Sequence, residues 1–194
     1  AGKSARTFDC SDDDRAIVET ADLLSLKPII YAANMDEAGF ADCESNAYFC
    51  AVRDLAAKEG AQVLPICAKL EQDIAELDDP EERAMFLEDL GIEQSGLDRL
   101  IQCSYELLGL ISFLTYGTDE CRAWTIKKGT KAPQAAGKIH SDIERGFIRA
   151  ETINFSEMIA CGSVAAAKEK GLLRSEGKEY VVKDGDMIYF RFNV

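Results

Sequence analysis

The sequence lacks any long apolar run and any paired cysteine motif, and it contains a single histidine, His140. No segment approaches the roughly 18 apolar residues that are needed to cross a bilayer. The opening stretch, AGKSARTF, has no apolar region of the kind found in signal peptides. We therefore expect a cytoplasmic protein with no membrane partner.

The seven cysteines are scattered along the chain without a C-x-x-C pair. An odd, dispersed set argues against a disulfide framework, and the missing pairs argue against structural zinc. We interpret the cysteines as reduced thiols that are mostly buried as small apolar residues. A catalytic Cys–His dyad that uses His140 is left open, although no pattern in the sequence supports it.

Acidic residues outnumber basic ones, and the imbalance lies in the first half of the chain. The formal net charge is −13 over 194 residues, of which 47% are hydrophobic and 29% charged, as is typical of a globular protein with a core. Residues 1–110 carry a net charge of −15, whereas residues 111–194 carry +2. This asymmetry predicts two domains with different partners and a boundary near residue 111.

The first domain alternates predicted helices with short apolar strands. Four apolar residues share one face of a helix predicted over residues 12–26, namely Ile17, Val18, Ala21 and Leu24. The following elements are a strand over 28–34, a helix over 43–60, a strand over 61–69 and helices over 78–91 and 95–111. Ser95 is placed to cap the last helix. Short apolar strands joined by a helix are typical of a parallel doubly wound sheet, so we predict an α/β fold.

The second domain has the pattern of a small mixed sheet that grips a helix. Strand-like segments cover residues 121–130 and 147–153, and helical segments cover 132–146 and 155–171. Residues 179–192 hold two β-rich runs on either side of Asp184-Gly185, which predicts a hairpin. Ile188, Phe190 and Phe192 alternate with more polar residues, so we expect their face to lie in the core.

The N-terminal Gly2-Lys3-Ser4 matches the end of a phosphate-binding G-x-x-x-x-G-K-[ST] loop. That loop works between a strand and a helix, because its backbone amides and the helix N-terminus must face the phosphates. Here a loop-like and then strongly acidic stretch follows, which would repel phosphate. We therefore do not assign phosphate binding to this segment.

Two polar loops follow the two predicted strands of the first domain. Their residues are Asn34, Met35 and Glu37 in the first loop and Cys67, Ala68 and Lys69 in the second. Ligands of open α/β sheets bind outside the carboxyl ends of the strands, and an asparagine offers a donor and an acceptor to a purine edge. Two such loops are compatible with a purine-binding site. On spacing alone a plain turn is the favoured interpretation, because Asn and Asp are common turn residues.

An N-x-x-E motif at Asn34, followed about 30 residues later by C-A-K at Cys67, resembles the last two nucleotide-binding motifs of P-loop GTPases, N-K-x-D and S-A-K. The chain resembles the YchF/Obg-like ATPase family more closely, because members of that family carry N-x-x-E. The similarity covers essentially the whole chain and is most specific over residues 122–151.

The resemblance implies the fold in more detail. Residues 1–110 are expected to be the C-terminal part of a doubly wound parallel-sheet P-loop NTPase domain, with residues 1–20 as a remnant of a helical insert. Residues 111–194 are expected to be a TGS domain, which has a β-grasp (ubiquitin-like) fold. The P-loop, the Mg²⁺-binding D-x-x-G motif and the switch loop would lie before residue 1.

The resemblance also implies that the family protein binds and hydrolyses ATP in preference to GTP and associates with ribosomes. Glu37 stands where N-K-x-D proteins have aspartate, and its longer side chain loses the bidentate fit to guanine. Met35 replaces lysine and offers an apolar contact to the base. ATP is the expected ligand, with Mg²⁺ held by the N-terminal region. Because phosphoryl transfer needs a phosphate cradle and a metal, we expect this segment alone to be inactive, without a catalytic residue or metal ligand.

Basic residues are concentrated between Arg122 and Arg149, where seven of them accompany two acids. Lys127, Lys128 and Lys131 are the candidates for contact with RNA or another partner. The charge alone fits RNA phosphates and a solvated sheet face equally well. The family resemblance implies ribosomal RNA as the partner, and DNA is not expected. Two wider alternatives stay open: a stand-alone RNA- or protein-interaction module with no nucleotide activity, and a GTPase relic with relaxed base choice.

Overall fold

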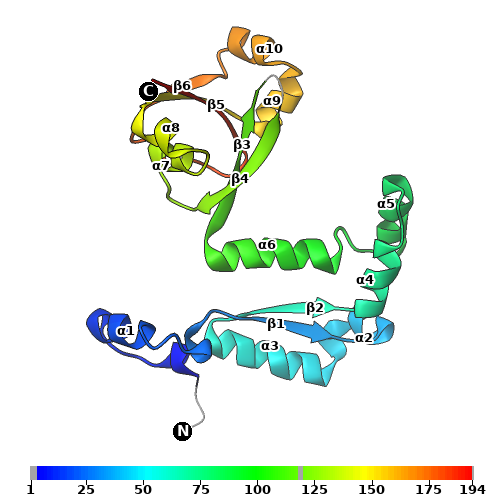
Figure 1. Cartoon of the computed structure of the whole chain (residues 1–194). Coiled ribbons are helices and arrows are strands. Elements are labelled where there is room, and N and C mark those ends of the chain that lie inside the picture. Colours follow the sequence, from blue (N-terminus) through cyan, green and yellow to red (C-terminus); the bar gives the residue numbers. More distant parts are fainter. Residues whose placement is uncertain (1–3, 118–119, 194) are drawn as a thin grey trace. The chain divides into compact units, whose positions relative to one another are not determined.

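The computed structural model describes residues 4–117 and 120–193. The chain divides into two compact units, Ala1–Leu107 and Leu108–Val194, which we call the N-terminal unit and the C-terminal unit (Figure 1). The assignment of residues 1–110 and 111–194 to two functional domains stays a prediction. Gly2 and Lys3 of the phosphate-loop match lie outside the described residues.

The N-terminal unit is built on two parallel strands. β1 (Ile30–Asn34) and β2 (Gln62–Ile66) pair in register, and α3 (Ala47–Glu59) connects them and packs against both (Figure 1). The other elements of this unit are η1 (Ala5–Thr7), α1 (Asp12–Glu19), η2 (Leu24–Leu26), α2 (Glu37–Ala41), η3 (Cys43–Ser45), α4 (Ala68–Ala75), α5 (Pro80–Asp89) and α6 (Gly96–Leu108). The predicted order of strand, helix and parallel strand is therefore observed.

Local signals explain where α3 begins and ends. Asn46 Oδ1 accepts hydrogen bonds from two backbone amides of the first turn, which makes Asn46 the N-cap. Gly60 ends the helix in the left-handed conformation with φ +64°, which glycine adopts at little cost. Phe49 and Ala56 on this helix are buried, and so is Leu64 on β2. Helix and strand therefore contribute to the core of the unit.

The prediction of one amphipathic helix over residues 12–26 is wrong. α1 ends at Glu19, where the hydroxyl of Thr20 donates to the carbonyl of Ile17 at 2.7 Å and so competes with continued helix. Asp22 then takes a positive φ of 45°, which no α-helix accommodates. Ile17 and Leu24, expected on a common buried face, are 68% and 81% exposed.

α6 begins as predicted and ends earlier than predicted. Ser95 Oγ accepts from Asp98 N at 3.1 Å, which confirms Ser95 as a cap. Gly109, with φ +62°, ends the helix, so residues 110 and 111 belong to a strand. Leu97 and Ile101 on the apolar face are 60% and 48% exposed. Within residues 4–117 and 120–193, neither this helix nor any other is long and apolar enough to span a membrane.

The C-terminal unit is a five-stranded mixed sheet. Its elements are β3 (Leu110–Tyr116), β4 (Cys121–Lys127), α7 (Ala132–Gly137), α8 (Ser141–Arg145), β5 (Phe147–Asn154), α9 (Phe155–Cys161), α10 (Val164–Glu169), β6 (Arg174–Glu176) and β7 (Asp186–Phe192). The strand order is β4-β3-β7-β5-β6, and the β3–β7 pair is parallel whereas the other pairs are antiparallel (Figure 1). The expected small mixed sheet is therefore observed.

Aromatic rings fill the core of the C-terminal unit. Phe190 on β7 meets Phe113 on β3 edge-to-face, with ring centroids 5.9 Å apart, and Phe147 on β5 at 6.2 Å. The alanines of α7 are buried in the same cluster, so this helix packs on the sheet. Ile188 and Phe190 are buried as predicted, whereas Phe192 is 45% exposed at the end of its strand.

The predicted hairpin over residues 179–192 is wrong. β7 lies between β3 and β5, so both of its hydrogen-bonding edges are already taken. Asp184 and Gly185 lie in a turn that is closed by a hydrogen bond from Asp186 N to Lys183 O at 3.2 Å, but the residues before this turn do not pair with β7, and the turn instead holds the chain to β3. Asp184 Oδ1 accepts from Ser112 N at 2.8 Å, and Gly185 N donates to Ser112 O at 2.9 Å. Pairing within the sheet thus overrides the local Asp-Gly signal.

Candidate functional site

The six residues singled out in the two loops of the first domain line one cavity of about 440 Å³, together with Asp36 and Ala38. They are Asn34, Met35 and Glu37 in the first loop and Cys67, Ala68 and Lys69 in the second. The cavity lies where β1 and β2 end. Because parallel neighbours finish at the same edge of a sheet, two loops 30 residues apart in sequence form one site.

The side chain of Asn34 fastens the two loops together. Its Oδ1 accepts a hydrogen bond from Ala68 N at 3.0 Å, and Met35 N extends the strand pairing by donating to Ile66 O at 2.9 Å. The side-chain NH₂ group of Asn34 has no protein partner within the described residues. Asn34 therefore keeps two hydrogen-bond donors for a ligand while its acceptor holds the loops.

Asp36 acts as a turn residue and helix cap in this loop. Its Oδ1 accepts from Gly39 N at 2.8 Å and caps the first turn of α2. The partner of Asn34, by contrast, is 34 residues away in sequence. Asp36 therefore forms the turn, whereas Asn34 forms the contact between the two loops.

A salt bridge joins the two loops that line the cavity. Lys69 Nζ lies 2.6 Å from Glu37 Oε1, and the two side chains are 74% and 52% exposed. The hydrogen bond with Glu37 raises the pKa of the Lys69 ammonium. The carboxylate of the first loop is therefore paired with the cation of the second.

The second loop starts a helix. Cys67 is 1% exposed and precedes α4 without a side-chain cap, and its thiol is buried in the core. The amide of Ala68 is not available to a ligand, because it already donates to Asn34. The next amides of the first turn of α4, beginning with that of Lys69, have no intrahelical acceptor because of their position.

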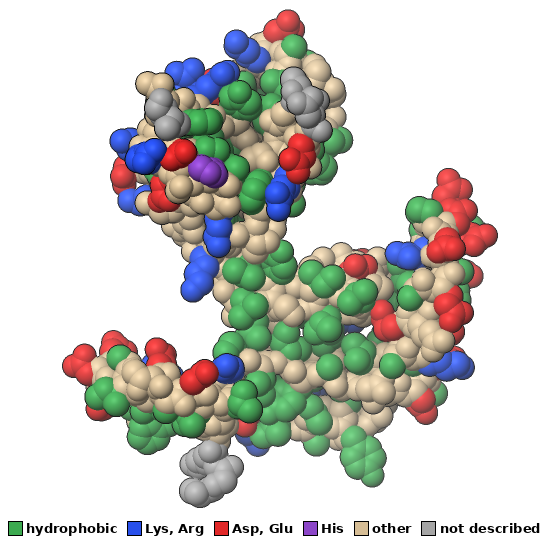
Figure 2. Space-filling view, in the orientation of Figure 1, with side chains coloured by type: hydrophobic (Ala, Val, Ile, Leu, Met, Phe, Trp, Pro, Cys, Tyr) green, Lys and Arg blue, Asp and Glu red, His purple; other side chains and the backbone are tan. Residues whose placement is uncertain are grey.

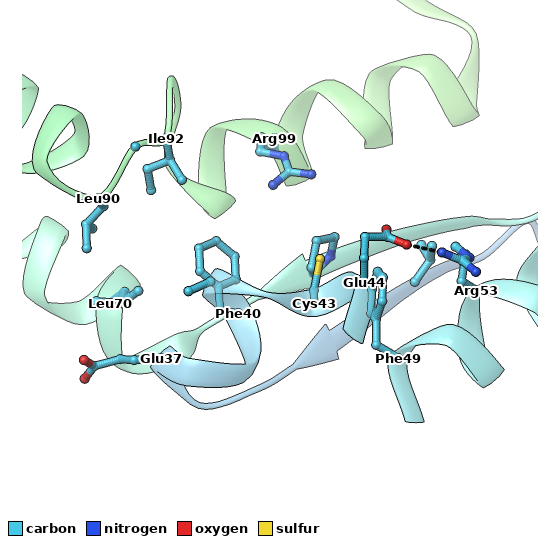
Figure 3. A pocket seen from close by; sticks show the side chains of 14 residues that line it. Glu37, Phe40, Cys43, Glu44, Phe49, Arg53, Leu70, Leu90, Ile92 and Arg99 are labelled. Atoms are coloured by element: carbon cyan, nitrogen blue, oxygen red, sulfur yellow. Dashed lines mark hydrogen bonds and ion pairs between the residues drawn. The ribbon is translucent and has the colours of Figure 1, made fainter. Parts of the chain in front are cut away.

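A second cavity in the N-terminal unit has a volume of about 700 Å³ (Figure 3). Its walls are mostly apolar and include Phe40, Phe49 and Leu70, with Arg99 of α6 on the opposite side from Phe49. Glu37 also lines this cavity, but Figure 3 shows its carboxylate pointing away from Phe40. The sequence patterns did not predict this cavity, because residues that line an apolar cavity and residues of an apolar core have the same periodicity.

The candidate RNA-binding lysines share one turn of the C-terminal unit. Lys127 ends β4, Lys128 follows it, and Lys131 precedes α7. Lys131 Nζ lies 2.5 Å from Glu179 Oε2, so its charge is compensated. The structure therefore brings the three lysines together but leaves Lys127 and Lys128 as the uncompensated pair among the described residues.

Figure 2 shows more Lys and Arg side chains over the C-terminal unit and more Asp and Glu side chains over the N-terminal unit. In the C-terminal unit, Arg122 lies over the ring of Trp124 at 4.3 Å, and Trp124 packs against the core. His140 caps α8 by accepting from Asp142 N at 3.2 Å. In the described part of the chain, His140 is thus engaged with a helix rather than with a thiol.

Disulfides and metal clusters are absent from the described residues. All seven cysteines are described, and each has a free thiol, but only Cys67 is buried, so the prediction that they are mostly buried is wrong. Among residues 4–117 and 120–193, no group of three or more His, Cys, Asp or Glu side chains is arranged to hold a metal ion. The acidic stretch before α5 caps that helix instead, since Asp79 Oδ1 accepts from Glu81 N at 2.9 Å.

Comparison with known proteins gives consistent matches along the chain. The family described as "YchF-GTPase_C: Protein of unknown function (DUF933)" matches residues 110–193. The "Ribosome-binding ATPase YchF" of Bacillus subtilis (strain 168) is 54% identical over 192 residues, which cover 99% of this chain and 52% of that protein. The protein of the same name from Escherichia coli O157:H7 is 52% identical over 97% of this chain and 51% of its own length.

Solved structures agree with these matches. The structure of the Schizosaccharomyces pombe YchF GTPase superposes with a TM-score of 0.81 at 32% identity, over 97% of this chain and 50% of that protein. A GTP-binding protein from Pyrococcus horikoshii OT3 has a TM-score of 0.61 at 22% identity, over 95% of this chain and 51% of that one, which supports the fold alone. The chain thus spans about half the length of the relatives that it matches. Residues 110–193 thus match the family model for the C-terminal region of YchF proteins, and nearly the whole chain is similar to about half of each YchF relative.

Proposed function

We propose that this chain supplies the base-recognition part of the ATP site in a cytoplasmic, ribosome-associated ATPase of the YchF family. The observation that carries the proposal is the Asn34–Ala68 hydrogen bond, which closes the two loops around one cavity. The names of the relatives, ribosome-binding ATPase and GTPase, support a nucleotide as the ligand. Fold class alone would not support a nucleotide as the ligand, since one fold hosts many functions.

Adenine fits the donors and acceptors that the loops leave available. The NH₂ group of Asn34 donates to N7 of the purine, which is an acceptor in adenine and guanine alike. The thioether side chain of Met35 lines the cavity and offers an apolar contact to the base. Discrimination against guanine then depends on the group that faces its N1–H and N2–H₂ donors, and Glu37 is the acidic candidate.

The phosphates and Mg²⁺ belong to another part of the protein under this proposal. Mg²⁺ would neutralise charge on the phosphates during phosphoryl transfer. The chain's own residues bind and orient the base, and the chain alone is expected to lack ATPase activity.

We propose that the C-terminal unit is a β-grasp TGS domain that contacts ribosomal RNA. The mixed sheet with α7 packed on its core supports the β-grasp assignment. The exposed Lys127 and Lys128 support contact with phosphates, for which a compact positive charge is well suited. DNA and membranes are not part of the proposal. A stand-alone RNA- or protein-interaction module is the second candidate, favoured by the +2 charge of residues 111–194.

Calorimetry on the full-length protein that contains this segment tests the proposed function. ATP is expected to bind more tightly than GTP, and Asn34→Ala is expected to weaken ATP binding at least tenfold, because the donors to the base and the hydrogen bond to Ala68 N are both lost. Circular dichroism of the variant separates loss of binding from loss of folding. Tighter GTP than ATP binding would favour the GTPase relic, and unchanged ATP affinity in the variant would leave the loop as a structural turn.

A further inference from the structure

The Glu37–Lys69 pair joins two backbones that are already fixed. Glu37 is the first residue of α2, whose N-terminus is capped by Asp36. Lys69 lies in the first turn of α4, which the Asn34–Ala68 hydrogen bond ties to the end of β1. The 2.6 Å contact between their side chains therefore spans the cavity between two anchored points.

Guanine and adenine place opposite demands on an acceptor at this position. The edge of guanine carries N1–H and N2–H₂ donors, which bind a free carboxylate well. Adenine has no donor at these two positions. A carboxylate that is already paired with an ammonium group has less acceptor capacity to offer guanine and gives adenine no disadvantage.

We propose that Lys69 determines the base specificity of this site by holding the Glu37 carboxylate in a salt bridge, so that guanine lacks a partner for its donors. The proposal rests on the proposed nucleotide site and goes beyond the longer reach of Glu37 relative to aspartate. Both side chains are more than half exposed, so the pair contributes little to folding and is open to a ligand.

The direction of Glu37 supports this role. Figure 3 shows its carboxylate turned away from Phe40, and thus away from the apolar cavity that Glu37 also lines. Glu37 has the largest effect on the pKa of Lys69 and raises it. Asp73 and Cys67 act electrostatically in the same direction, so all three favour the charged form of Lys69. Lys69 therefore stays cationic at neutral pH and keeps the pair intact.

Four variants of the full-length protein test the role of Lys69. Lys69→Met keeps the apolar stem and removes the charge, whereas Lys69→Arg keeps a cation. Glu37→Gln removes the carboxylate, and the double variant removes both groups. Lys58→Met, on the exposed end of α3, is the matched control. ATP and GTP affinities are measured by calorimetry for each protein, with circular dichroism as the check on folding.

Lys69→Met is expected to raise GTP affinity about tenfold relative to ATP affinity, because the freed carboxylate forms charge-assisted hydrogen bonds with guanine. Lys69→Arg and Lys58→Met are expected to keep the wild-type preference. The double variant, Lys69→Met with Glu37→Gln, should not show this gain in GTP affinity, since the gain requires the Glu37 carboxylate.

Equal changes in ATP and GTP affinity, or no change, in Lys69→Met would overturn the proposal and leave the proposed function standing. A gain for GTP that persists in the double variant would also overturn it, because Glu37 would then not be the acceptor. Wild-type protein that binds neither nucleotide, or Asn34→Ala with unchanged binding, would instead remove the proposed function and this inference with it.

Discussion

The carboxylate of Glu71 accepts two hydrogen bonds from the first turn of α6, from Gly96 N at 2.7 Å and from Leu97 N at 3.1 Å. Glu71 lies on α4, two residues after Lys69, so the helix that starts at the candidate site also caps the last helix of the N-terminal unit. A carboxylate at a helix N-terminus satisfies free amides and interacts favourably with the helix dipole. Two hydrogen bonds therefore join α4, which begins at the candidate site, to α6.

Replacement of Glu71 by alanine is expected to destabilise the N-terminal unit by about 1–2 kcal/mol, because two charge-assisted hydrogen bonds to a helix terminus are lost. Urea unfolding followed by circular dichroism measures the change. Glu76→Ala, at the other end of α4, is the matched control, since within the described residues the Glu76 carboxylate accepts a hydrogen bond from the exposed Gln72 side chain and from no other group. Equal effects of the two substitutions would show that the cap does not stabilise the unit.

Gly146 in the C-terminal unit has no room for a side chain. A Cβ atom there would lie 2.1 Å from the backbone oxygen of Asn193, and backbone atoms cannot move aside as a flexible side chain can. Gly146→Ala is therefore expected to cost about 1–3 kcal/mol of unfolding free energy. Gly177→Ala, where a Cβ atom meets nothing within 4 Å, should be nearly neutral. Thermal unfolding of both variants checks the difference, and similar melting temperatures would contradict it.

Tyr180 is expected to titrate far above an ordinary tyrosine. Burial and a 2.6 Å hydrogen bond donated to Asp186 raise the pKa of its phenol from 10.0 to about 12. Because the folded state favours the protonated phenol, its contribution to stability is complete below pH 10 and is lost as the pH rises towards 12. Tyr180→Phe should remove this part of the alkaline loss of stability.

Absorbance of the phenolate between pH 9 and 11, compared with Tyr180→Phe, isolates this tyrosine among six. Asp186→Asn is expected to lower the pKa of Tyr180, because the neighbouring carboxylate is removed, while burial keeps the value above 10. A Tyr180 that ionises near pH 10 in the unsubstituted protein would disprove the buried hydrogen bond.

Lys127 and Lys128 are expected to contribute more to ribosome binding than Lys131 does. Lys131 is paired with Glu179, whereas the other two lysines are exposed on the same turn. Replacing Lys127 and Lys128 with Glu should reduce co-sedimentation of the full-length protein with ribosomes at low salt, and Lys131→Glu alone should reduce it less. Each lost phosphate contact should also lower the salt slope of binding by about 0.7–0.9.

Lys168 and Lys170 provide the control for this prediction. They are exposed on and just after α10 of the same unit, so replacing both with Glu makes the same change of charge elsewhere. Equal losses in the two double variants would point to the net charge of the unit. An unchanged affinity after substitution of Lys127 and Lys128 would leave the turn as a solvated surface.

Local signals in the sequence were sufficient to predict the strands and helix ends that position the candidate site. The apolar runs of β1 and β2, the C-cap at Gly60 and the cap at Ser95 depend on neighbouring residues, and the structure confirms them. The shared position of the two loops also follows, because adjacent parallel strands end at one edge. Such features require no knowledge of distant contacts.

The remaining features depend on distant partners or on competition between them. The Asp184-Gly185 pair favours a hairpin locally, but β7 finds two partners elsewhere in the sheet. The Glu37–Lys69 pair joins residues that are 32 positions apart, and its formation depends on the directions of two long side chains. The occupied amide of Ala68 is likewise visible only once Asn34 is placed. Sequence patterns do not contain these directions.

Asn34→Asp tests the central claim most directly, because aspartate can accept from Ala68 N as Asn34 does but has no NH₂ group for a purine. ATP affinity is measured by calorimetry in the full-length protein, with the unfolding free energy measured in parallel. If Asn34 reads the base, ATP affinity falls at least tenfold while stability changes by less than about 0.5 kcal/mol. ATP affinity equal to that of the unsubstituted protein would contradict base recognition by this loop.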